Sequence, residues 1–203
     1  YAAINGAEQF LSAAFGRYRG YMTEKEKMLA GKLYRASDAE LSAAHRRAIS
    51  LCEKLNFGFL SDGERDSLTR ELLGKCGKRA VLGRGFWCDY GKNIEVGENF
   101  FTNYDVVILD VCKVTIGDNC LIAPQAGIYT AAHPLEREVR ISGLEYGSPV
   151  TIGNDVWIGG GARILPGVTL GNNVVVGAGS VVTKSFGDNV VIAGNPARVI
   201  RHL

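Results

Sequence analysis

The stretch IGNDVWIGGGARILPGVTLG, residues 152–171, carries an aliphatic side chain every six residues, at Ile152, Ile158, Ile164 and Leu170. A helix repeats near 3.6 residues and a strand near 2, so neither element alone explains a period of six. If the chain turns after each unit, one aliphatic side chain per unit points into a central core, and a neighbouring glycine permits the tight turn. Three units then close a triangular coil of about eighteen residues, and stacked coils pair as parallel strands. The stretch therefore predicts a parallel β-helix.

The six-residue period extends beyond this stretch in both directions. It continues to Val176 and Val182, and earlier runs occupy residues 82–94, 96–108 and 116–128, with two-residue phase slips between the first runs. Residues 129–150 do not carry the pattern. With this gap removed, the repeat accounts for roughly five coils. An ordinary βαβ protein would need helices between its strands, and none is visible in residues 150–187.

The chain before residue 78 is predicted to be helical. Three S/T-x-x-E capping boxes predict helix starts: Thr23 with Glu26, Ser37 with Glu40, and Ser61 with Glu64. After Ser37, one helix face is apolar: Leu41, Ala44, Ala48, Leu51 and Leu55. His45 lies beside this face, and we interpret residues 45–47 as a solvated edge. The predicted organisation is an unassigned extension (1–21), a helical segment (22–77), and a repeat domain (78–203) with a protruding loop at 129–150 and a C-terminal cap.

Composition excludes several classes of protein. The 203 residues are 46% hydrophobic, which is enough for a real core, and the net charge is only +2. Without a long basic run, we expect no nucleic-acid partner and no membrane surface. No apolar run approaches the roughly 18 residues of a transmembrane helix, and the first residues lack a basic leader, so we expect a cytoplasmic protein. Five cysteines without a CxxC pair indicate reduced, packed thiols. A zinc site is the alternative, but no spacing supplies clustered ligands.

Several motifs together resemble one family. The segments IGDNCLIAP, IYTAAHPLE, GLEYGSPVTIGNDVWIGGGARILPGVTLG, VVGAGSVVTK and IAGNPARVI are similar to those of the maltose and galactoside O-acetyltransferases. The resemblance also covers MLAGKLYRASDAEL and CDYGKNIEVG, and so spans about residues 22–203. It implies a mainly β fold: a left-handed parallel β-helix of hexapeptide repeats with an N-terminal α-helical segment. It also implies transfer of an acetyl group from acetyl-CoA to a sugar or glycoside hydroxyl, with no metal required.

The resemblance assigns the reaction to the interrupted part of the repeat. His133, inside the interruption, falls on the family's catalytic histidine; imidazole titrates near neutral pH and can take the proton of a sugar hydroxyl as it attacks. Glu145 matches a glutamate of this loop and is the candidate that orients His133, although an ordinary exposed carboxylate is an equal alternative. The backbone N–H of Gly160 is the candidate donor to the oxyanion. Many relatives carry serine at this position, so a side-chain contribution is absent here.

The resemblance also implies an acceptor site and a donor site. Asp89, Asn103 and Asp110 match polar positions near the sugar, because carboxylates and amides suit hydroxyl groups; Asp110 alternatively stabilises a turn. Arg35 stands where many relatives have aspartate, and Asp38 is close but not clearly equivalent. Coenzyme A is expected at Trp157, Gly160, Ala178, Thr183, Lys184, Arg198 and Arg201, with the basic residues meeting phosphates. Trp157 could instead pack against a neighbouring chain. We expect a homotrimer with sites between chains, because a single solenoid surface is convex.

Other functions stay open at this point. A zinc carbonic anhydrase needs three histidine ligands, and only His133 and the terminal His202 lie in the repeat domain. A non-catalytic β-helix scaffold would have no reason to keep His133, Asn103 and the basic end together. Acetyltransferases for a non-sugar acceptor, of the serine or chloramphenicol type, are the nearest rivals. The segment MLAGKLY favours the sugar group.

Overall fold

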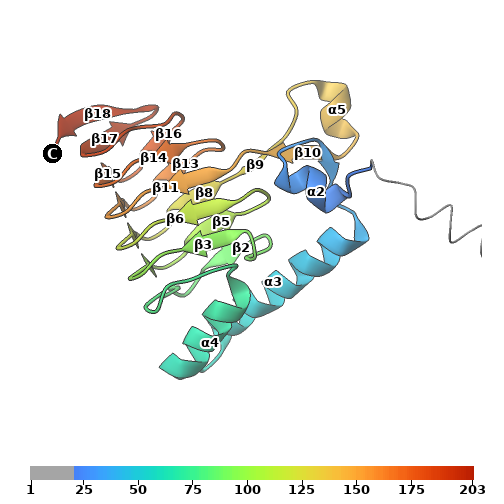
Figure 1. Cartoon of the computed structure of the whole chain (residues 1–203), viewed down its shortest axis with the longest axis horizontal. Coiled ribbons are helices and arrows are strands. Elements are labelled where there is room, and N and C mark those ends of the chain that lie inside the picture. The colour runs from blue at the N-terminus through green and yellow to red at the C-terminus, as the bar shows by residue number, and fades with distance from the viewer. Residues whose placement is uncertain (1–20) are drawn as a thin grey trace, which may run out of the picture.

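The repeat region forms a triangular β-helix in the computed structural model of the chain, which describes residues 21–203 (Figure 1). Each full coil adds one segment to each of three sheets, all parallel except for the final β17–β18 pair. Sheet 1 contains β3 (Ile94–Val96), β6 (Val114–Ile116), β11 (Val150–Ile152) and β14 (Thr169–Leu170). Sheet 2 contains β4 (Phe101–Thr102), β7 (Leu121–Ile122), β12 (Trp157–Ile158), β15 (Val174–Val176), β17 (Val190–Gly194) and β18 (Ala197–His202). Sheet 3 contains β2 (Trp87–Cys88), β5 (Val107–Leu109), β8 (Gly127–Tyr129), β13 (Arg163–Ile164) and β16 (Val181–Val182).

The predicted aliphatic ladder is the core of these coils. Every sixth residue from Ile152 to Val182 is at most 1% exposed, and Ile158 stands in register with Val176 one coil later. The phase slips also have a structural cause: in the three-residue strand β3, Ile94 and Val96 both point inward, because alternate strand residues share a face. The five strands of sheet 3 confirm the prediction of roughly five coils.

From residue 21 onward, three helices precede the first coil: α2 (Glu24–Leu29), α3 (Ala39–Phe57) and α4 (Asp62–Leu72). The capping boxes at the starts of α2 and α4 are confirmed. The box predicted at Ser37 is wrong, because Asp38 is the N-cap of α3 and its carboxylate accepts the N–H groups of Glu40 (2.9 Å) and Leu41 (3.3 Å). A charged aspartate also interacts favourably with the helix dipole, which serine does not. The second half of the predicted apolar face of α3, from Ala48 to Leu55, packs on the core of the coils, whereas Leu41 and Ala44 pack in a second cluster with Met28 and Tyr34. Near the end of α3, the Asn56 side chain donates to Phe86 O and accepts from Gly85 N.

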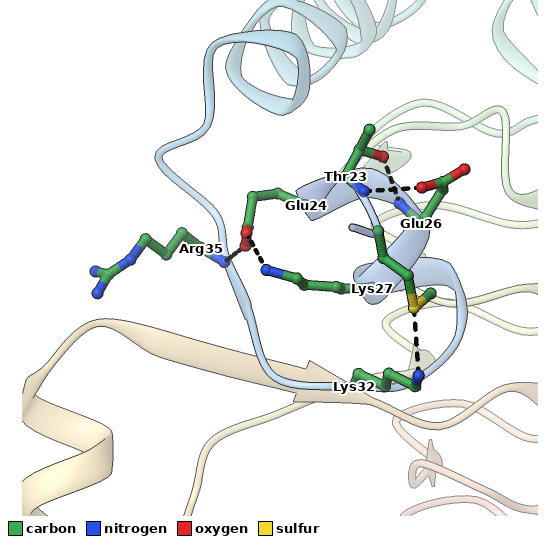
Figure 2. Close-up of polar contacts among 7 residues, drawn as sticks. Thr23, Glu24, Glu26, Lys27, Lys32 and Arg35 are labelled. Carbon is green, nitrogen blue, oxygen red and sulfur yellow. Dashed lines mark hydrogen bonds and ion pairs between the residues drawn. The ribbon is translucent and has the colours of Figure 1, made fainter. Parts of the chain in front are cut away.

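The chain between α2 and α3 is held by a network around Glu24. Its carboxylate accepts the backbone N–H of Arg35 at 2.6 Å and pairs with Lys27 (Figure 2). The Arg35 side chain points away from this cluster (Figure 2), and its guanidinium lies 3.5 Å from Ser142 O. Tyr34, its neighbour in β1 (Tyr34–Arg35), is 1% exposed. The network therefore holds β1 in the position in which the Tyr34 side chain is buried.

The interruption of the repeat has its own fold. It contains β9 (Ala131–Ala132), α5 (Arg137–Ile141) and β10 (Leu144–Gly147), and β10 pairs with both β9 and β1. In Figure 1, α5, β10 and α2 stand together at one edge of the stack of coils. The N-terminal segment thus anchors the loop to the coils. The first pairing of the solenoid, Lys75 with Glu95, lies three residues before the boundary expected at 78.

The three sheets meet at three corners, which we name for use below. The insertion corner, from sheet 3 to sheet 1, comprises residues 89–93, 110–113, 130–149, 165–168 and 183–185. The asparagine corner, from sheet 1 to sheet 2, comprises residues 97–100, 117–120, 153–156, 171–173 and 187–189. The glycine corner, from sheet 2 to sheet 3, comprises residues 103–106, 123–126, 159–162 and 177–180.

Candidate active site

The residues predicted for the site lie mainly at two different corners of the β-helix. The insertion corner carries Asp89, Asp110, His133, Glu145, Thr183 and Lys184, whereas the glycine corner carries Asn103, Gly160 and Ala178. Trp157 lies on the outer face of sheet 2, and Arg198 and Arg201 lie on β18. One full sheet separates the two corners. The structure of a single chain therefore does not bring all of the predicted residues together.

A cavity of about 460 Å³ opens at the insertion corner. Helix α3, strand β1, the inserted loop and the first two coils all contribute to its wall, through Tyr34, Ala36, Ser42, His45, Arg46, Asp89, Tyr90, Leu109, Val111, Ala131 and Glu145. The wall combines two carboxylates, two phenols and an imidazole. Such a lining suits a small ligand with several hydroxyl groups.

Asp89 presents its carboxylate to this cavity. Burial raises the pKa of Asp89, while the nearby His45 acts in the opposite direction. Within residues 21–203, no hydrogen bond or ion pair engages the carboxylate oxygens of Asp89. Its oxygens therefore remain available to a ligand.

Asp110 holds the turn that carries Asp89. Its carboxylate accepts the backbone N–H groups of Asp89 (3.0 Å), Tyr90 (2.9 Å) and Asn93 (3.3 Å), and the side chain is 0% exposed. Burial raises the pKa of Asp110 to about 7 despite these hydrogen bonds. The sequence suggested two roles for Asp110, substrate binding and stabilisation of a turn, and these contacts are typical of the second role. We therefore treat it as a positioning residue.

His133 directly follows β9, and Glu145 lies on the neighbouring strand β10 of the inserted loop. β9 and β10 pair Ala132 with Tyr146, so continuing this antiparallel register by one residue places His133 opposite Glu145. The Glu145 carboxylate accepts the Tyr34 hydroxyl at 3.0 Å, and burial together with this carboxylate raises the pKa of Tyr34. In the part of the chain that the structure describes, His133 makes no side-chain hydrogen bond and is exposed. The orienting contact expected from Glu145 therefore remains a prediction.

The glycine corner offers free backbone donors. The N–H groups on either side of Gly160 are engaged in hydrogen bonds: Gly159 donates to Val176 O, and Gly161 donates to Pro124 O. For residues 21–203, no carbonyl or side chain accepts the N–H of Gly160 or of Ala178, which follows it eighteen residues later at the same place on the next coil. Asn103, at the same corner, uses its side-chain oxygen to accept the N–H of Tyr104 at 2.8 Å.

The basic residues expected at the donor site are exposed and spread over the last coil. Lys184 follows β16 at the insertion corner, with its ammonium 5.6 Å from the ring centre of Phe186. Arg198 is paired in register with Ala193 on β17, next to the glycine corner, and Arg201 is paired with Val191. Lys184 and Arg198 thus flank opposite edges of sheet 3.

Sequence reasoning missed part of the cavity. Residues 45–47 are all exposed, as the interpretation of a solvated edge expected, and Arg47 lies 3.6 Å from Glu71. That interpretation did not include the part that His45 and Arg46 take in lining the cavity. Tyr34, Ser42 and Tyr90 were not singled out either. One signal was present: His45 follows the buried Leu41 by four residues and so continues its face of the helix.

Two features are absent from the part of the chain that the structure describes: a group of metal-ligating side chains and a membrane-spanning helix. Between residues 21 and 203, no three His, Cys, Asp or Glu side chains are grouped so that they could hold a metal ion. All five cysteines are free thiols, as predicted. None of the helices described here has the length and apolar character needed to cross a membrane.

Comparisons with known proteins define the class to which this fold and site belong. The maltose acetyltransferase hexapeptide capping motif matches residues 27–77, and the bacterial transferase hexapeptide model, with six repeats, matches residues 149–184. A maltose O-acetyltransferase from Clostridium difficile has a TM-score of 0.87 and 53% identity, over 90% of this chain and 98% of that one. A galactoside acetyltransferase in complex with coenzyme A has a TM-score of 0.86 and 42% identity, over 90% and 92%. A hexapeptide-repeat acetyltransferase from Vibrio cholerae, complexed with acetyl coenzyme A, has a TM-score of 0.83 and 39% identity, over 90% and 99%.

These similarities identify a hexapeptide-repeat acyltransferase. The chain belongs to the galactoside and maltose O-acetyltransferase family, as its motifs indicated. The helical segment that forms one wall of the cavity is the capping motif of this family, and the inserted loop precedes the matched repeats. The expectation of an acyltransferase is thereby confirmed.

Proposed function

We propose that this protein transfers the acetyl group of acetyl-CoA directly to a hydroxyl of a sugar or glycoside, with His133 as the general base. The observation that carries the proposal is the polar cavity at the insertion corner, lined in part by Ala131 of β9, the strand directly before His133. The free carboxylate of Asp89 can accept hydrogen bonds from two hydroxyls. The named activities of the relatives agree with this acceptor class.

The reaction follows from the chemistry of these groups. A neutral His133 takes the proton of the bound hydroxyl as its oxygen attacks the thioester carbonyl. The carbonyl oxygen becomes an oxyanion, and the unpaired N–H of Gly160 donates a hydrogen bond to it. The intermediate then expels the thiolate of coenzyme A, and the proton on His133 passes to this leaving group. Glu145, opposite His133 in the continued register, would stabilise the imidazolium that forms.

Coenzyme A would lie along the glycine corner and end on the basic groups of the last coil. The free N–H of Ala178 lies one coil beyond Gly160 and can bind an amide carbonyl of the pantetheine arm. The side chains of Thr183, Lys184, Arg198 and Arg201 are all exposed at the C-terminal end, where cations and a hydroxyl suit phosphate oxygens. Two relatives of known structure hold coenzyme A or acetyl coenzyme A.

The arrangement of the groups leads us to propose a homotrimer with its sites between chains. His133 and Gly160 lie at different corners of one chain, so a site containing both needs the glycine corner of a second chain. The outer face of sheet 2 is suited to such packing: Val81, Phe101, Leu121 and Trp157 stand in register on it and are 38–53% exposed. The outer positions of sheet 1 in register are polar, with Glu95, Thr115, Thr151 and Thr169. An apolar stripe of this kind marks an interface, and three chains close it with cyclic symmetry.

An acetylation assay with a panel of acceptors tests the proposed function. Free thiol release from acetyl-CoA is measured with glucose, maltose, a β-galactoside, serine and chloramphenicol, and the acetylated product is identified by mass spectrometry. We expect O-acetylated sugar products from the wild type and none above background from His133→Ala. Turnover confined to serine or chloramphenicol would replace the sugar acceptor. We also place the reaction in the cytoplasm, since five free thiols suit a reducing compartment.

A further inference from the structure

His45 is a cavity residue that the reaction described above does not use. It lies on α3, within the capping motif, at one wall of the cavity. Its Nδ1 is 2.9 Å from the backbone carbonyl oxygen of Asp89. Its ring meets the Tyr90 ring edge-on, with the centroids 6.1 Å apart and the planes at 69°. Two contacts therefore fix the position and the orientation of the imidazole.

The contact with Asp89 decides which nitrogen serves the cavity. A carbonyl oxygen can only accept, so Nδ1 carries the hydrogen of the neutral ring. Nε2 then has a lone pair and no intrachain partner among residues 21–203. In the neutral imidazole it accepts a hydrogen bond, for example from a hydroxyl that enters the cavity. Nε2 of His45 and the carboxylate of Asp89 can therefore each accept a hydrogen bond from a different hydroxyl of the same ligand. The hydrogen bond from His45 to the backbone of Asp89 keeps the two groups close together.

We propose that His45 is a specificity-determining residue, whose Nε2 accepts a hydrogen bond from a second, non-reacting hydroxyl of the acceptor. This inference rests on the proposed function and names the acceptor class more closely: a sugar with neighbouring hydroxyls, of which one reacts at His133 and others bind Asp89 and His45. It also gives the capping segment a part in substrate choice. Helix α3 packs on the first coil with one face, and His45 at the edge of that face contacts the acceptor.

The test separates the two nitrogens of the ring. In His45→Asn the shorter amide can keep the hydrogen bond to the carbonyl of Asp89 but cannot reach into the cavity. In His45→Gln the longer amide can place a polar group near the position of Nε2. We expect His45→Asn to raise KM for the acceptor by about 3–10-fold, the effect of one lost neutral hydrogen bond, and His45→Gln to recover part of that loss. KM for acetyl-CoA and kcat should stay within about twofold of the wild type, because His45 contacts neither the donor nor the reacting oxygen.

A set of deoxy acceptors distinguishes recognition from a structural role. The wild type should discriminate against the deoxy sugar that lacks the hydroxyl bound by His45, and His45→Asn should lose this discrimination while retaining it for the other positions. Equal losses for all acceptors, or a fall in kcat with unchanged KM, would overturn the proposal. Arg47→Gln, on the same helix but outside this cavity, is the matched control and should leave the acceptor profile unchanged. A wild type that acetylates no sugar would refute the proposed function itself, whereas an active enzyme indifferent to His45→Asn would refute only the role of His45.

Discussion

The asparagine corner and the insertion corner each connect two sheets in successive coils, yet they are built in opposite ways. At the asparagine corner the solution repeats. The side-chain oxygens of Asp118, Asn154, Asn172 and Asp188 each accept a backbone N–H from the preceding coil at 2.7–2.8 Å. The residue that follows each of these four is in the left-handed region, with φ of 54–58° at Asn119, Asp155, Asn173 and Asn189. Asparagine and aspartate tolerate this conformation better than most side chains.

At the insertion corner no two turns are alike. One is held by the buried Asp110, one carries the inserted loop with His133, and one contains Lys184. The difference indicates that the two corners have different roles. A corner that repeats its chemistry stabilises the stack, whereas a corner that abandons the repeat can place different groups around a ligand.

The largest expected effect is at the insertion corner. His133→Ala should lower kcat by about 10²–10⁴-fold, because the attacking hydroxyl loses its base, while coenzyme A still binds. Steady-state kinetics and calorimetric titration of coenzyme A measure the two quantities. His202→Ala, near the exposed C-terminal end, is the control and should be close to the wild type. Near wild-type turnover of His133→Ala would rule out its role as base.

The turn at Asp110 should make stability depend on pH. The ordinary pKa of an aspartate is 3.8, whereas burial raises that of Asp110 to about 7. Between these values the folded chain keeps a proton that the unfolded chain has lost, so the free energy of unfolding falls as pH rises, by at most about 1.4 kcal/mol per pH unit. Asp110→Asn should remove this slope. Urea denaturation at fixed protein concentration from pH 4 to 7 measures it, and parallel pH profiles of the two proteins would contradict the assignment.

A lesion at the asparagine corner should change stability without changing chemistry. The Asn119 amide donates to Asp155 at 2.8 Å and its oxygen accepts from Asn99 at 2.7 Å, while φ is 56°. Asn119→Ala should lower the free energy of unfolding by about 1–2 kcal/mol through the lost hydrogen bonds and the strained backbone. Asn119→Gly, which relieves the strain but not the lost bonds, should be less destabilised. An altered KM at a temperature where both variants are folded would mean that this corner is not merely structural.

The smallest expected effects concern the donor phosphates. Lys184→Ala and Arg198→Ala should each raise KM for acetyl-CoA by about 3–10-fold, and less for dephospho-acetyl-CoA, if they meet the 3′-phosphate. The comparison of the two donors measures this contact directly. Equal effects on both would place the lost contact elsewhere on the nucleotide.

The contrast between corners also explains what the sequence could reveal. The core was predictable because one aliphatic per six residues, as at Ile158 and Ile164, is a local pattern with a single geometric solution. The helix starts were predictable to within a residue, and the error at Ser37 arose because Asp38 competes for the same N–H groups. The inserted loop was visible only as a break in the pattern.

The cavity could be predicted only in part, because its wall joins segments far apart in the chain. Asp89 and Glu145 were recognised from motifs, whereas Tyr34 and His45 lie in a helical segment whose periodicity reports packing alone. No local pattern shows that the strand of Tyr34 pairs with β10, more than a hundred residues later. The role of Asp110 likewise depends on the three N–H groups that the fold brings to it.

The most direct test of the account is whether two defective chains can restore one site. His133→Ala damages the insertion corner and Asn103→Ala the glycine corner. If each site combines the insertion corner of one chain with the glycine corner of the next, a randomly mixed equimolar assembly has about a quarter of its sites without a lesion. We predict recovery of about that fraction of wild-type activity after the two variants are co-refolded, and no recovery from His133→Ala with Asp89→Ala, whose lesions share a corner. An active monomer in sedimentation, or no recovery in a confirmed mixed assembly, would contradict the shared site.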